Sequence, residues 1–189
     1  MTKKQIENNL LKITETKRSD YTEPLWENDT FLENIFYCVD FKYSLNSVLD
    51  LIPPNKFAKL HIVHAAVANC MRNHYTIFVD DIYERVPSEK WNDMNFCGFL
   101  VNLHYSAIKY VSEELKMKKE IFFVACEAVP EMNDYDEYAY ITSFSVILKE
   151  IPDSLKKDEG FKSEILEIIT KAYEGTNATF DLEELKKMI

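Results

Sequence analysis

The chain has 189 residues, of which 47% are hydrophobic and 29% are charged, and its formal net charge is −10. This balance is typical of a globular protein with a buried core and excludes a mainly disordered chain. Only three glycines occur, whereas usual composition would give roughly thirteen. Both the dinucleotide-binding motif and the P-loop need closely spaced glycines, so both classes of nucleotide-binding protein are excluded.

The cysteines give no metal or redox motif. Cys38, Cys70, Cys97 and Cys126 form no C-x-x-C pair, which excludes a zinc ribbon and a thioredoxin-type site. Each lies in an apolar stretch, so we expect buried thiols. The first 18 residues lack the apolar run of a secretory signal, and no window holds eighteen uninterrupted apolar residues. We therefore expect a cytoplasmic protein without membrane spans.

The first half of the chain predicts helices separated by an acidic loop. Apolar residues recur there at the spacing of one helical face. Thr30 and Glu33 form the pattern of a capping box, which places a helix start at Thr30. The segment 75–86 alternates partly like a strand, but helix is the favoured interpretation. The predicted helices are 3–16, 30–39, 44–52, 55–72 and 75–86, with 19–29 as the acidic loop.

The second half predicts a long central helix and four shorter ones. The segment 93–115 is apolar over most of its surface, which is typical of a helix at the centre of a core. A β-hairpin within 121–148 is an alternative, because aromatic and β-branched residues are frequent there. The other predicted helices are 120–129, 138–151, 161–172 and 182–189, with 130–137 as a second acidic loop. The fold prediction is a mainly α, single-domain bundle of about eight helices.

The negative charge lies in two windows of the sequence. Residues 19–41 contain six acidic residues, residues 120–148 contain six more, and neither window contains Lys or Arg. The two windows also hold 12 of the 25 aromatic residues. Aromatic rings beside carboxylates are typical of recognition surfaces, where the rings supply contact area and the charges guide association. A solvated surface that only keeps the protein soluble is the alternative.

These windows supply the candidate binding residues. We expect them to lie together in space and to present aromatic rings to a positively charged protein partner. The candidates are Glu23, Trp26, Glu27 and Asp29 in the first window, and Glu131, Asp134, Tyr135, Asp136, Glu137 and Tyr138 in the second.

Residues that could carry catalysis are sparse. His61 and His64 share a predicted helical face, but no carboxylate completes a metal site there. Asp80, Asp81 and Glu84 are weak candidates for a magnesium site, and a solvated helix face is the ordinary interpretation. His104 is expected to be a hydrogen-bonded core residue rather than a catalytic base. The sequence predicts no cofactor.

Three functional hypotheses remain open. The first is a non-enzymatic acidic protein, of the inhibitor or immunity type, that masks a basic surface of a protein partner such as a nuclease. The second is a helical scaffold that binds a peptide or helix in an apolar groove. The third is a metal-dependent enzyme that uses His61 and His64. Direct binding of nucleic acid or of a membrane surface is disfavoured, because Lys and Arg form no large cluster.

Overall fold

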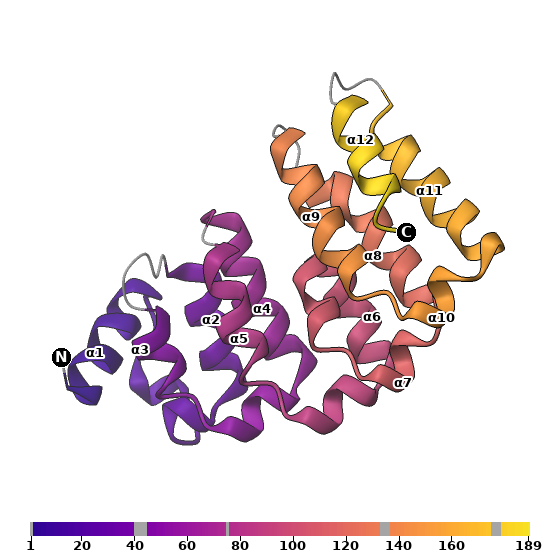
Figure 1. Cartoon of the computed structure of the whole chain (residues 1–189). Coiled ribbons are helices and arrows are strands. Elements are labelled where there is room, and N and C mark those ends of the chain that lie inside the picture. The colour runs from indigo at the N-terminus through magenta and orange to yellow at the C-terminus, as the bar shows by residue number, and fades with distance from the viewer. Residues whose placement is uncertain (1, 40–44, 75, 133–136, 175–178) are drawn as a thin grey trace. The chain divides into compact units, whose positions relative to one another are not determined.

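A computed structural model describes residues 2–39, 45–74, 76–132, 137–174 and 179–189, and every regular element in these ranges is a helix. The mainly α prediction is therefore confirmed. Eight of the described helices have seven residues or more, which agrees with the predicted bundle of about eight helices, although ten helical segments were proposed along the sequence. The chain divides into two compact units, Met1–Pro87 and Ser88–Ile189, and each is described by itself (Figure 1). A single domain stays a prediction.

The first unit is built around the contact between α2 and α4. Helix α2 packs against α4, and Phe31, Ile35 and Phe36 of α2 and the small residues Ala65 and Ala66 of α4 are all completely buried. Small side chains at such a contact let two helices approach closely. The elements of this unit are α1 (Lys3–Ile13), η1 (Arg18–Asp20), η2 (Leu25–Glu27), α2 (Asp29–Cys38), α3 (Leu45–Leu49), η3 (Pro54–Ala58), α4 (Leu60–Arg72), η4 (Thr76–Phe78) and α5 (Val79–Tyr83).

A buried amide ties the end of α2 to α4. The side-chain nitrogen of Asn69 donates to the backbone carbonyls of Phe36, at 2.5 Å, and Val39, at 2.7 Å. Arg72 donates to the carbonyls of Phe36 and Tyr37. The last carbonyls of a helix have no partner within the helix, so these bonds satisfy groups that α2 itself cannot.

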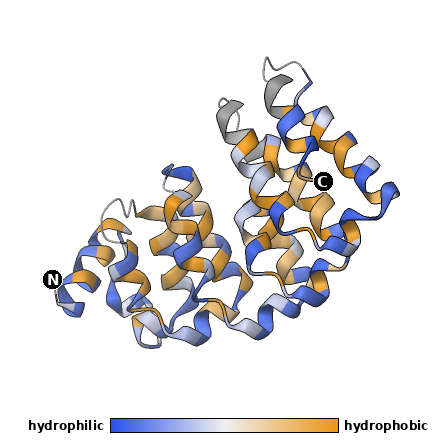
Figure 2. Ribbon diagram, in the orientation of Figure 1, coloured by the Kyte–Doolittle hydropathy of each residue, from blue (hydrophilic) through white to orange (hydrophobic). Residues whose placement is uncertain are grey.

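The second unit is arranged around α8, which packs against α6, α9 and α11 (Figure 1). Phe122, Ala125 and Cys126 of α8 are buried, in keeping with this central position. Figure 2 shows apolar residues along α6 and α8 and hydrophilic residues along the outer part of α11. The elements are η5 (Ser88–Asn92), α6 (Met94–Leu103), η6 (Tyr105–Lys109), α7 (Glu113–Lys116), α8 (Lys119–Met132), α9 (Glu137–Lys149), α10 (Asp153–Lys156), α11 (Glu159–Ala172) and α12 (Thr179–Lys186).

The prediction of one helix over 93–115 is wrong. Helix α6 ends at Leu103, and His104 has an extended backbone with φ −156° and ψ 122°. The ring Nδ1 of His104 lies 2.9 Å from the Ser106 hydroxyl and accepts the Ser106 backbone N–H, which begins η6 instead of continuing α6. Such a local bond offers the backbone an alternative to the helix. His104 is 5% exposed and hydrogen-bonded, as predicted.

Several other boundaries also differ from the prediction. Helix α2 is capped by Asn28, whose side chain accepts the Phe31 N–H, so its start is not at Thr30. The predicted helix 55–72 is divided at Lys59 into η3 and α4. The segment 121–148 is helical on both sides of residues 133–136, so the β-hairpin alternative is wrong for the described part. Helix α10 was not predicted, and α12 begins before residue 182.

The link between Asn69 and α2 gives a stability prediction. Asn69→Ala should lower the free energy of unfolding by about 1–3 kcal/mol, because the buried carbonyl of Val39 loses this donor. Urea unfolding followed by circular dichroism measures the change. The exposed Asn46→Ala is the matched control and should change stability by less than about 0.5 kcal/mol. Equal stability of the two variants would contradict the proposed contribution of this amide.

Candidate protein-binding surface

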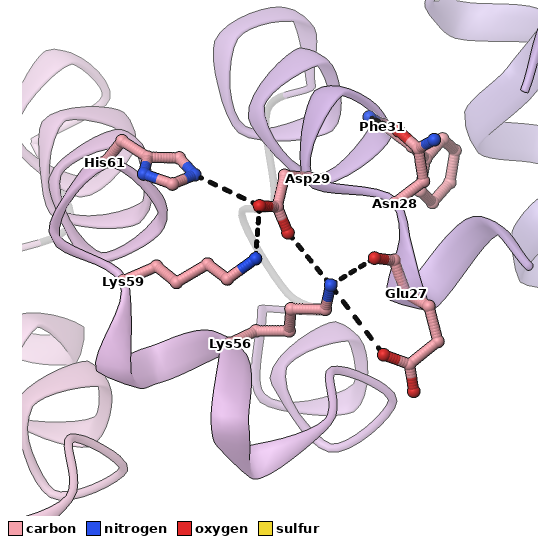
Figure 3. A network of polar contacts seen from close by, with 7 residues as sticks. All are labelled: Glu27, Asn28, Asp29, Phe31, Lys56, Lys59 and His61. Atoms are coloured by element: carbon pink, nitrogen blue, oxygen red, sulfur yellow. Dashed lines mark hydrogen bonds and ion pairs between the residues drawn. The ribbon is translucent and has the colours of Figure 1, made fainter. Parts of the chain in front are cut away.

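A network of ion pairs surrounds Asp29, the first residue of α2 (Figure 3). Its carboxylate oxygens lie 2.9 Å from Lys56 Nζ and 2.5 Å from Lys59 Nζ, and His61 Nε2 lies 3.5 Å away. Lys56 also donates to the backbone carbonyl of Glu27 and lies 3.7 Å from the Glu27 carboxylate. The network therefore joins the start of α2 to η3 and to the start of α4.

Charge pairing changes the titration of this network. Burial alone would raise the pKa of Asp29, but hydrogen bonds from Lys59 and Lys56 and the charges of both lysines lower that pKa to about 2. Burial alone would likewise lower the pKa of Lys56, but the hydrogen bond and charge of Asp29 raise it above its ordinary value. The amino-terminal end of α2 adds to the stabilisation of the Asp29 carboxylate. Asp29 and Lys56 are thus both charged at neutral pH.

Most of the first-window candidates are engaged within the fold. Trp26 is only 3% exposed, and its indole N–H donates to the Glu7 carboxylate at 2.8 Å. Its ring therefore packs inside the unit and does not form surface. Asp29 and Glu27 are paired with lysines from later in the chain. Glu23 is exposed, so it is the one of these four that lies on the surface without a described ion pair.

Most of the second-window candidates lie outside what the structure describes. This applies to Asp134, Tyr135 and Asp136, and to the side chains of Glu131, Glu137 and Tyr138. Backbone at 131–132 and 137–138 belongs to α8 and α9, so the predicted acidic loop 130–137 is partly helical. The shared face of the two windows would combine residues from both compact units, and it stays a prediction.

The second unit carries most of the protein's negative charge. Residues 88–189 contain 20 acidic and 12 basic side chains, a formal charge of −8, whereas residues 1–87 contain 12 and 10, a charge of −2. In the first unit, the acidic window is opposed by Lys56 and Lys59. The second unit therefore has the larger excess of negative charge for an acidic binding surface.

Helices α8 and α11 form a groove that has this character. It measures about 380 Å³ and is lined by Phe123 and Glu127 of α8 and by Glu164, Glu167, Ile168 and Lys171 of α11. Phe123 and Ile168 are half-buried, and the three glutamates are exposed. The groove thus combines an apolar floor with a rim of three carboxylates and one ammonium group.

The glutamates of this groove form no ion pair among the described residues. Glu127, Glu164 and Glu167 form no ion pair within the described part of the chain, in contrast to Asp29. The nearby Lys119 is engaged by Asp158, with Nζ 2.6 Å from Oδ2. Asp158 also caps α11 by accepting the Phe161 N–H. Three carboxylates against the single ammonium group of Lys171 leave a local negative potential at the groove.

The described residues give little evidence of a metal site or of a reactive thiol. No three His, Cys, Asp or Glu side chains among them are placed to hold a metal ion, and the Nε2 atom of His61 lies 3.5 Å from the Asp29 carboxylate. Burial raises the pKa of the Cys70 and Cys97 thiols to about 12 and that of Cys126 further, so these thiols are not nucleophiles at neutral pH. Cys38, predicted to be buried, is exposed at the end of α2.

The sequence interpretation missed the groove because it followed local charge runs. Glu164, Glu167 and Lys171 are separated by three and four residues around Ile168, which places all four on one face of a helix. That spacing was available as a signal. The contact of this face with Phe123 and Glu127, some forty residues earlier, cannot be read from the sequence.

Comparisons of the chain with protein-family models, with curated proteins and with solved structures found no match. Within the described residues, no helix is long and apolar enough to cross a membrane. Function is therefore inferred from the chemistry of the surface.

The Asp29 network predicts an acid-sensitive contribution to stability. Because the folded-state pKa of Asp29 lies below its ordinary 3.8, ionised Asp29 stabilises the fold above about pH 4, and this contribution is lost as the pH falls through about 2. Asp29→Asn should cost about 1–2 kcal/mol at pH 7, less than the full pKa shift because the side chain is 31% exposed.

Urea unfolding at several pH values between 7 and 2 tests this expectation. The difference between the native protein and Asp29→Asn should narrow as the pH falls from 4 to 2. Glu84→Gln, at an exposed position of the same unit without a described ion pair, is the control and should leave the pH profile unchanged. A stability difference for Asp29→Asn that stays constant with pH would contradict the electrostatic account.

Proposed function

We propose that the chain is a non-enzymatic acidic binding protein, of the inhibitor or immunity type, that masks a basic surface of a protein partner such as a nuclease. The observation that carries the proposal is the set of exposed glutamates on α8 and α11, Glu127, Glu164 and Glu167, which outnumber the single lysine of the groove, Lys171, and form no ion pair in the described part of the chain. Lys or Arg side chains of a partner would supply the missing counter-charges.

Charge of this kind acts mainly on association. A surface with one predominant sign attracts an oppositely charged partner over roughly one Debye length, about 8 Å at physiological ionic strength. Exposed ion pairs contribute only about 0.2–1 kcal/mol each, so the three glutamates would favour encounter and orientation more than affinity. Affinity would come from apolar contact beside them, which Phe123 and Ile168 offer.

The same apolar pair keeps the scaffold hypothesis open as a second candidate. A helical adaptor that binds through Phe123 and Ile168 alone would depend on buried apolar area. Its binding would change little with salt, whereas masking of a basic surface weakens as salt rises. The response to salt therefore separates the two candidates.

The glutamates give the functional prediction. With the partner purified from the native host by affinity capture, E164K/E167K should weaken binding by about tenfold or more, through slower association and reduced salt dependence. Surface plasmon resonance at several salt concentrations measures both effects. Each reversal replaces an attraction by a repulsion without altering the buried face of α11.

Two further variants complete this experiment. E89K/E114K makes the same change of charge at exposed positions of the same unit and should leave affinity within about twofold of the native protein. D134K/D136K/E137K tests the remaining candidates of the second window. Affinity that is independent of salt and unaffected by either acidic variant would exclude masking of a basic surface and favour the apolar scaffold.

A further inference from the structure

The two helices that line this groove, α8 and α11, run in the same direction. Lys119 pairs with Asp158 near the starts of α8 and α11, and one helical turn later the Phe123 ring lies 5.6 Å from that of Phe161. Further along, Glu127 faces the part of α11 that contains Glu164 and Ile168. Because the contacts advance in the same direction along both helices, α8 and α11 are parallel.

The residues that line the groove recur at the helical spacing along both helices. On α8, Phe123 and Glu127 are four residues apart, so they lie one above the other on one face. On α11, Glu164 and Ile168 are also four residues apart, as are Glu167 and Lys171. The groove therefore repeats at the helical spacing, with an apolar pair, Phe123 and Ile168, flanked by carboxylates.

We propose that this groove binds one helix of a partner protein, and that this helix presents an apolar residue flanked by Lys or Arg. The apolar side chain would lie on Phe123 and Ile168, and the flanking cations would meet Glu127, Glu164 and Glu167. This inference rests on the proposed function, and it adds the site and the class of ligand. The commitment to a basic helix comes from charge complementarity, since the groove carries three carboxylates against the single cation Lys171.

A helix fits this surface better than an extended peptide. An extended peptide binds most readily by adding to the edge of a sheet, and the described residues contain no strand. The groove between two parallel helices instead offers ridges and hollows at three- and four-residue spacing, which match the side-chain rows of a third helix. Residues at i, i+3, i+4 and i+7 of such a ligand would face Phe123, Ile168 and the glutamates together.

Four labelled peptides of roughly 18 residues, long enough to form a helix in an alanine-rich host, test the inference. The first carries two Leu flanked by Lys on one face. In the second the Leu residues are Ala, in the third a central Pro breaks the helix, and in the fourth the Lys residues are Glu. We expect the first to bind the full chain at least about tenfold more tightly than each of the others, by fluorescence anisotropy.

Protein variants locate the binding. E164Q/E167Q should weaken binding of the first peptide by about tenfold, and Ile168→Ala, at a half-buried position, by about fivefold. The exposed E89Q/E114Q is the matched control and should bind as the native protein does. Circular dichroism melting of each variant tests whether the fold is retained. If Ile168→Ala does not fold, the milder Ile168→Val takes its place.

The outcomes separate this inference from the proposed function. Equal binding of the Leu and Ala peptides, or of the helical and Pro peptides, would overturn the helix-binding groove and leave an acidic surface that recognises charge alone. Binding of the first peptide that is unaffected by E164Q/E167Q and by Ile168→Ala would place the site elsewhere and also overturn the inference. The proposed function itself would fail separately, if the native partner bound independently of salt and of E164K/E167K.

Discussion

The pairing of carboxylates with lysines within the chain determines which part of this protein has carboxylates available for a binding partner. Lys56 is 7% exposed, and an ammonium group at that depth needs an anion beside it. Asp29 supplies that anion, and it also holds Lys59 and fixes the start of α2 against the start of α4. Removing one partner of such a pair costs more than the pair itself contributes, because the other charge remains poorly solvated. These carboxylates therefore stabilise the first unit.

The second unit uses its carboxylates differently. Lys119 and Asp158 close the beginning of the α8–α11 contact, in the same manner as the Asp29 network closes that between α2 and α4. Beyond this pair, Glu127, Glu164 and Glu167 face solvent around Phe123 and Ile168. Their mutual repulsion is weak in water, so the fold tolerates it, but it strengthens when a ligand excludes water from the groove. A ligand that carries cations would offset this repulsion, whereas a neutral or acidic ligand would not.

The sequence predicted the features that depend on local spacing. The helical class followed from apolar periodicity, and the buried, hydrogen-bonded state of His104 followed from its position within an apolar run. The break at His104 could not be predicted from periodicity, because a side-chain bond to Ser106 ends α6 while the apolar pattern continues. Trp26 was assigned to the surface for a similar reason: its partner Glu7 is 19 residues away, and the sequence does not show that their side chains meet.

Charge counted along a sequence is a poor guide to charge on a surface, and the two windows illustrate the reason. The first window lacks cations of its own, yet Lys56 and Lys59 reach it through the tertiary fold. Glu164 and Glu167 belong to neither window, because lysines at 162 and 171 lie close to them in sequence. In the folded helix, however, Lys162 does not pair with Glu164 or Glu167. Its Nζ lies 3.0 Å from the Glu159 carboxylate, and the groove glutamates form no ion pair among the described residues. The charge of a surface therefore depends on which carboxylates the fold pairs with lysines, and in the α8–α11 groove three carboxylates share the single lysine Lys171.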